Sequence, residues 1–103
     1  MTIGELLSRS GLTGASDALT HDVSLISPTG VFLDSREVIV GGIFVALPGL
    51  HTNGIEFVGE AYSRGAALVV SEEEPPPGIS EAWVRVAHAR DALASLAANF
   101  HDN

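Results

Sequence analysis

Two uninterrupted apolar runs, Ile43 to Leu47 and Ala67 to Val70, constrain the fold of this 103-residue chain more than any other feature. A strand that is apolar at every position is typical of a sheet covered on both faces, because none of its side chains meets solvent. Between the runs, Val58 and Ala61 follow helical spacing, and Gly65 stands where a glycine commonly ends a helix. The pattern therefore predicts strand, helix, strand, with a crossover long enough for parallel pairing.

Further elements complete the pattern around this unit. Thr2 and Glu5 form a capping-box pattern that predicts a short N-terminal helix. Two more strands are expected at Val31 to Leu33 and at Trp83 to Ala87, and a last helix with one apolar face is expected from about Arg90. The sequence thus predicts a single small α/β domain with a mixed sheet that contains a βαβ unit.

The amino-acid composition limits the partners that this chain can bind and the chemistry that it can perform. Thirteen acidic and five basic residues give a net charge of −8, which argues against a nucleic-acid or anionic-membrane surface because both require clustered Lys and Arg. The absence of cysteine excludes disulfides, thiolate catalysis and cysteine metal sites. The N-terminus lacks the basic and apolar regions of a signal peptide, and no apolar stretch is long enough to span a membrane. We expect a cytoplasmic protein.

The loop after the first apolar run, Pro48-Gly49-Leu50-His51-Thr52-Asn53-Gly54, is one candidate ligand site. In open α/β sheets, ligands bind beyond the carboxyl ends of the strands and near helix N-termini. Backbone amides of such a loop can face a phosphate, and its glycines allow close approach. An ordinary strand-to-helix turn explains the same spacing, so both interpretations stay open.

The motif Asp34-Ser35-Arg36 ends another expected strand and is a second candidate. A hydroxyl beside a cation can hold a diphosphate or the edge of a uracil. Alternatively, Asp34 and Arg36 pair locally while Ser35 caps a turn.

A hydrolase triad of Asp34, Ser35 and His51 is disfavoured because no G-x-S-x-G elbow surrounds the serine. We therefore expect no catalytic residues. The histidines lack the spacing of a metal site, so we expect no metal-binding residues either.

The run from Asp34 to Gly49, DSREVIVGGIFVALPG, resembles the N-terminal signature of the Mur ligases, in which DSR, a spacer, glycine and FVAL-x-G follow one another. The similarity continues through Asn53-Gly54-x-x-Phe57 and into the last helix, and it covers about residues 30–101. Within the family, the ending ALASLAANF is closest to MurE, the UDP-N-acetylmuramoyl-tripeptide synthetase, and MurF is the second candidate.

This resemblance implies a function for residues 1–103 as a truncated domain. They would form the N-terminal domain that binds the UDP part of UDP-N-acetylmuramoyl-dipeptide, the substrate of an ATP-dependent amino-acid ligase of peptidoglycan biosynthesis. ATP and Mg²⁺ would belong to a central domain with a P-loop, which this chain lacks, so no cofactor and no ligase activity are expected here. The remaining domains of the ligase would be its partners. A stand-alone nucleotide-binding or interaction module of the same fold is the alternative from another class.

The resemblance also implies which residues meet the substrate, two of them in the DSR segment and three in the loop that wraps the nucleotide. These expected site residues are Leu33, Ser35, Leu50, His51 and Thr52, with supporting roles for Asp34, Arg36, Asn53 and Gly54. The chain departs from the family pattern at Asn53-Gly54-Ile55, where Asp-Gly-His is usual, and at His88, where Asp is usual. Because His is a poorer helix cap than Asp, we expect the last helix to start differently.

Overall fold

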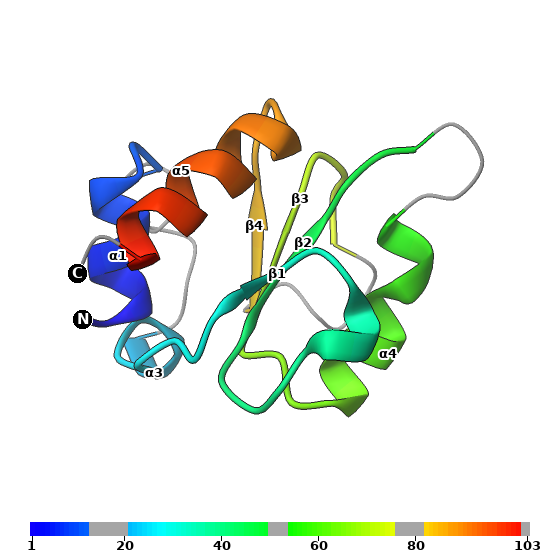
Figure 1. Ribbon diagram of the computed structural model, residues 1–103, viewed down its shortest axis with the longest axis horizontal. Coiled ribbons are helices and arrows are strands. Elements are labelled where there is room, and N and C mark those ends of the chain that lie inside the picture. Colours follow the sequence, from blue (N-terminus) through cyan, green and yellow to red (C-terminus); the bar gives the residue numbers. More distant parts are fainter. Residues whose placement is uncertain (13–20, 50–53, 76–81, 102–103) are drawn as a thin grey trace.

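The computed structural model describes residues 1–12, 21–49, 54–75 and 82–101. Four strands form one parallel sheet with the order β1-β2-β3-β4 (Figure 1). Their bounds are β1 (Val31–Phe32), β2 (Ile43–Ala46), β3 (Leu68–Ser71) and β4 (Trp83–Arg85). The expected α/β class and the βαβ unit are confirmed. The expected mixed sheet is corrected: all pairings between the described strands are parallel, and β1 and β2 each lead into helical segments and not into a hairpin.

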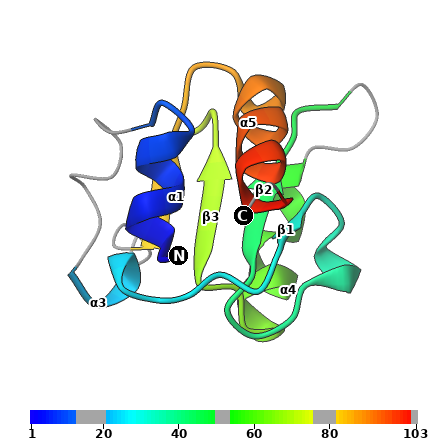
Figure 2. The same cartoon turned by 60° about the vertical axis from the view of Figure 1, so that its left-hand side comes forward.

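Helices cover both faces of this sheet. On one face lie α1 (Ile3–Arg9) and α5 (Ala89–His101), and β3 is seen between these two helices in Figure 2. The other face is covered by the 3-10 helix η1 (Ser35–Glu37) and by α4 (Val58–Ser63), which continues from a second 3-10 helix, η2 (Gly54–Phe57). The turn-rich segment before β1 contains a four-residue helix, α3 (His21–Ser24).

Alternation of side chains along β2 explains why its sequence is apolar throughout. Ile43 and Val45 pack in the core beneath α1 and α5, whereas Phe44 and Ala46 point to the opposite core beneath α4. Successive side chains of a strand face opposite sides, so a strand between two helical layers needs an apolar residue at every position. Each fully buried Val, Leu or Ile stabilises the fold by about 1.5–3 kcal/mol relative to exposure.

Local signals at the helix ends match the structure. The capping box at Thr2 forms, with its hydroxyl accepting from the backbone N–H of Glu5 at 3.2 Å. α4 ends where the sequence pattern predicts, with Gly65 at a φ of +99° just after its last turn. In the described part of the chain, no helix has the length and hydropathy needed to cross a membrane.

The parallel arrangement brings two loop segments to one edge of the sheet. The carboxyl end of β1 leads into residues 33–36, and the carboxyl end of β2 leads into residues 47–49. Strands that pair in parallel end at the same edge, so these segments lie beside each other, next to η2 and α4. Ligands in open α/β sheets bind at such an edge.

Candidate functional site

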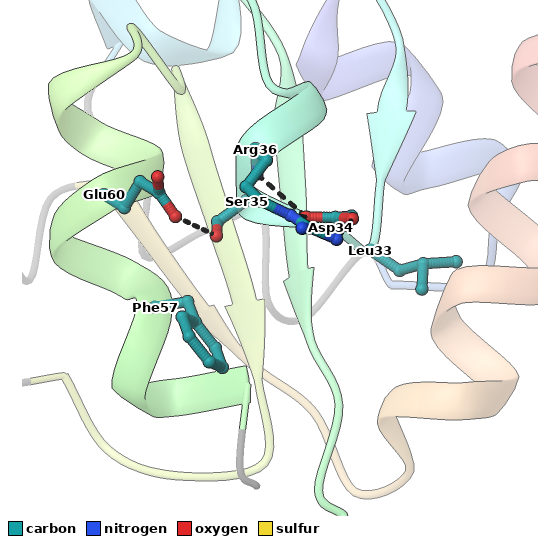
Figure 3. Close-up of a pocket in the computed structure, with 6 residues that line it drawn as sticks. All are labelled: Leu33, Asp34, Ser35, Arg36, Phe57 and Glu60. Carbon is teal, nitrogen blue, oxygen red and sulfur yellow. Dashed lines mark hydrogen bonds and ion pairs between the residues drawn. The ribbon is translucent and has the colours of Figure 1, made fainter.

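A cavity of about 440 Å³ opens at the carboxyl end of β1. This volume is within the range of small-molecule sites, which hold about 300–1,000 Å³. The walls come from the segment after β1, from η2 and from α4, as Figure 3 shows. The lining residues are Leu33, Asp34, Ser35, Arg36, Phe57 and Glu60.

Ser35 supplies a buried polar group in this cavity. Its residue is 5% exposed, and its hydroxyl donates a hydrogen bond of 2.6 Å to Oε1 of Glu60 (Figure 3). The hydroxyl is aimed at α4 because Ser35 is the first residue of η1, which packs on α4. The serine of the DSR motif therefore links η1 to α4, two elements that are distant in sequence.

Asp34 and Arg36 pair with each other on the outer side of η1. The carboxylate of Asp34 accepts from Nε of Arg36 at 3.1 Å and from a terminal guanidinium nitrogen at 2.8 Å, and it caps η1 by accepting from the backbone N–H of Arg36 at 2.9 Å. The hydrogen bond from the Arg36 side chain lowers the pKa of Asp34 to about 2. Local pairing of these two residues is thus confirmed. Capping of the turn by Ser35 is wrong, since Asp34 provides the cap.

Among the described residues that line the cavity, the charges are close to balanced. Glu60, the second carboxylate, lies 3.5 Å from Nε of Arg64, one turn further along α4. Each acid of the lining therefore faces an arginine. Two large apolar side chains are partly open to solvent beside these pairs, Phe57 at 40% and Leu33 at 60% exposure. An apolar wall with a few polar groups suits a flat ring that carries hydrogen-bonding groups on its edge.

The structure brings together four of the expected site residues: Leu33, Asp34, Ser35 and Arg36. The loop residues Leu50, His51, Thr52 and Asn53 lie outside the described residues. Gly54 opens η2, whose last residue, Phe57, lines the cavity.

Sequence reasoning missed Phe57 and Glu60 as site residues. A signal was present, because residues three apart share a helical face, and these two stand on the helical segment that follows the candidate loop. What the pattern does not show is that this face turns toward Ser35. Within the described ranges, His, Asp and Glu form no group of three or more that could hold a metal ion.

Comparison with known proteins decides the family. Residues 28–101 match the family described as "Mur ligase family, catalytic domain". The chain is 39% identical over 100 residues to the UDP-N-acetylmuramoyl-L-alanyl-D-glutamate–2,6-diaminopimelate ligase of Solibacter usitatus, a match that covers 97% of this chain and 20% of that protein. The chain belongs to the Mur ligase family. The resemblance seen in the DSR and FVAL motifs is confirmed.

Other Mur ligases are similarly close to this chain. The ligase of the same name from Chlorobium phaeobacteroides is 37% identical over 105 residues, which cover 98% of this chain and 20% of that protein. The UDP-N-acetylmuramyl-tripeptide synthetase of Roseiflexus sp. is 47% identical over 73 residues, which cover 70% of this chain and 14% of that protein. The chain thus spans about a fifth or less of the length of these curated relatives.

Solved Mur ligase structures share the fold. MurF from Acinetobacter baumannii superposes with a TM-score of 0.68 at 23% identity, over 98% of this chain and 21% of that chain, a likeness of fold alone. MurF from Thermotoga maritima, solved in complex with ADP, gives a TM-score of 0.59 at 30% identity, over 75% of this chain and 17% of that chain. The expected Mur ligase-like architecture is therefore confirmed.

Proposed function

We propose that residues 1–103 are the N-terminal, UDP-binding domain of a MurE-type ligase that acts in the cytoplasm in peptidoglycan biosynthesis. The observation that supports this most directly is the cavity around Ser35, at the carboxyl end of β1 in a chain of the Mur ligase family. The relatives that match nearly the whole chain are named as ligases that join 2,6-diaminopimelate to UDP-N-acetylmuramoyl-L-alanyl-D-glutamate. MurF stays the second candidate, because the solved structures that share this fold include MurF enzymes.

The cavity suits the uracil end of such a substrate. Phe57 offers an exposed aromatic surface against which a base can stack, and Ser35 offers a buried oxygen to the edge of the base. Leu33 adds apolar surface at the rim. The balanced lining favours a neutral ring over a phosphate at this point, because each carboxylate already faces an arginine.

The diphosphate would lie outside the cavity, toward Arg36 and the loop after β2. Arg36 uses two N–H groups for Asp34, and with 77% of its side chain exposed the guanidinium can also reach an anion. Leu50, His51 and Thr52 are proposed to wrap the nucleotide, with support from Asn53 and Gly54. Such local donors are needed because the net charge of −8 repels a diphosphate at long range.

The domain would hold one end of the substrate while the rest of the enzyme acts on the other end. Holding the UDP end fixes the position of the distant carboxylate that reacts, so binding energy is used for orientation. ATP and Mg²⁺ would act in the remaining domains, which this chain contacts as partners. Residues 1–103 alone are then expected to bind the nucleotide and to form no peptide bond.

Calorimetric titration of the chain with UDP and with ATP tests this proposal. UDP should bind and ATP should not, and Ser35→Ala should weaken UDP binding by about tenfold, the cost of one hydrogen bond to a buried polar group. Ser63→Ala is the matched control, because Ser63 is exposed on α4 and does not line the cavity. Equal binding of UDP and ATP, or equal affinity in the Ser35→Ala variant, would contradict the proposal.

A further inference from the structure

The hydrogen bond between Ser35 and Glu60 has a direction, and that direction restricts what the serine can offer to a ligand. A carboxylate can only accept, so the hydrogen in the 2.6 Å contact belongs to the Ser35 hydroxyl. This length is typical of a charge-assisted O–H···O⁻ bond, about 2.5–2.7 Å. With its hydrogen committed to Glu60, the Ser35 oxygen has only lone pairs left for a ligand.

Two further contacts keep the hydroxyl hydrogen of Ser35 directed toward Glu60. Arg64 lies 3.5 Å from Oε2 of Glu60, which leaves Oε1 turned to Ser35. The other carboxylate of the cavity lining, Asp34, has both of its oxygens bonded to Arg36. Glu60 is therefore the carboxylate of the lining that orients the Ser35 hydroxyl, as Figure 3 shows.

Uracil and cytosine differ at N3, the ring position that the Ser35 oxygen would face. Uracil carries an N3–H donor between two carbonyl oxygens, whereas N3 of cytosine is an acceptor with a lone pair. An oxygen that can only accept matches the uracil N3–H and opposes the cytosine N3. Phe57, on the same helical face as Glu60, provides a ring surface for either base and does not discriminate between them.

We propose that Glu60 is a positioning residue that sets base specificity: by holding the hydrogen of Ser35, it makes the cavity select uracil over cytosine. The inference rests on the proposed function, because it requires a pyrimidine nucleotide in this cavity. Glu60 acts through Ser35, and the property it controls is the ratio of two affinities.

Dissociation constants of UDP and CDP, measured by calorimetry on the full chain, test the inference. The unaltered protein should prefer UDP by about tenfold or more, because a site built for a hydrogen bond rejects a base that cannot form it. In Glu60→Met the Ser35 hydroxyl is free to turn and donate to cytosine N3, and the preference should fall to within about threefold. In Glu60→Gln a single amide oxygen remains to accept from Ser35 or from Arg64, so the preference should lie between those of the unaltered protein and of Glu60→Met.

Two controls distinguish a change in base specificity from a change in overall affinity for nucleotides. Loss of Glu60 leaves Arg64 without this partner and changes the attraction for every diphosphate, but that change cancels in the ratio of UDP to CDP. Glu56→Gln is the matched control, because Glu56 is exposed on η2 and is not part of the cavity lining. Its ratio should equal that of the unaltered protein.

The outcomes distinguish this inference from the function on which it rests. If the unaltered protein binds UDP but binds CDP equally well, or if Glu60→Met keeps the full preference, the role of Glu60 is overturned while UDP binding stands. If the unaltered protein binds neither nucleotide, the proposed function and the inference fail together.

Discussion

The carboxylate of Glu72, just after β3, accepts a hydrogen bond of 2.8 Å from the backbone N–H of Ala89, the first residue of α5. The N–H groups in the first turn of a helix have no carbonyl partner within the helix, and a negative charge there also meets the positive end of the helix dipole. His88, which precedes α5, is a poor capping residue. A carboxylate from another loop satisfies the N–H at that position instead, as the departure at His88 led us to expect.

Replacement of Glu72 by Ala should therefore destabilise the domain. The loss of a capping hydrogen bond lowers the free energy of unfolding by about 1–2 kcal/mol. Urea denaturation followed by circular dichroism measures this difference. Glu73→Ala is the control, since the side chain of Glu73 is exposed while its backbone N–H donates to Ser71 and its carbonyl oxygen accepts from Trp83. Equal destabilisation by the two variants would show that Glu72 does not cap α5.

The pair of Asp34 and Arg36 should give stability that depends on pH. The pKa of Asp34 is lowered from 3.8 to about 2, chiefly by the side-chain hydrogen bond from Arg36. A carboxyl group with a depressed pKa contributes stability that is present above pH 3.8 and is lost as the pH falls toward 2. The titration midpoint of the Asp34 carboxyl carbon, followed by ¹³C NMR, should lie near 2 and should rise toward 3.8 in Arg36→Gln. A midpoint that Arg36→Gln leaves unchanged would contradict this cause.

Gly65 and Gly11 offer a comparison of two glycines with positive φ. Gly65 has a φ of +99°, and a Cβ added there would lie 2.8 Å from Cα of Val40. Gly11 has a φ of +77° with nothing within 4 Å of such a Cβ. Gly11→Ala should cost only the backbone strain, about 1–2 kcal/mol, and Gly65→Ala should cost more because the backbone of Val40 must also move. Thermal unfolding of both variants measures the difference, and equal melting temperatures would count against the close approach at Val40.

The sequence was sufficient to predict elements whose signals are local. The two apolar runs predicted β2 and β3 because a strand buried on both faces leaves no other pattern. Thr2 and Glu5 predicted α1 because the two residues of a capping box lie within one helical turn. The crossover predicted the parallel direction of β2 and β3, but the direction of the β1–β2 and β3–β4 pairs was not evident, because side-chain alternation is the same in parallel and antiparallel sheets.

Interactions between distant segments could not be read from the sequence. Ser35 and Glu60 are 25 residues apart, and Glu72 and Ala89 are 17 residues apart. Nothing in either local pattern indicates the partner, which becomes a neighbour only once the sheet has formed. α3, with four residues, is too short to show helical periodicity.

Titration of the ¹⁵N-labelled chain with UDP, followed by NMR with ATP as the control, shows whether the cavity around Ser35 binds the nucleotide. UDP should shift the amide signals of the cavity segments, residues 33–36 and 57–60, and ATP should leave them in place. UDP-N-acetylmuramoyl-dipeptide should shift the same signals. If millimolar UDP leaves these signals unchanged, or shifts only signals of α1 and α5 on the opposite face of the sheet, the cavity around Ser35 is not a UDP site.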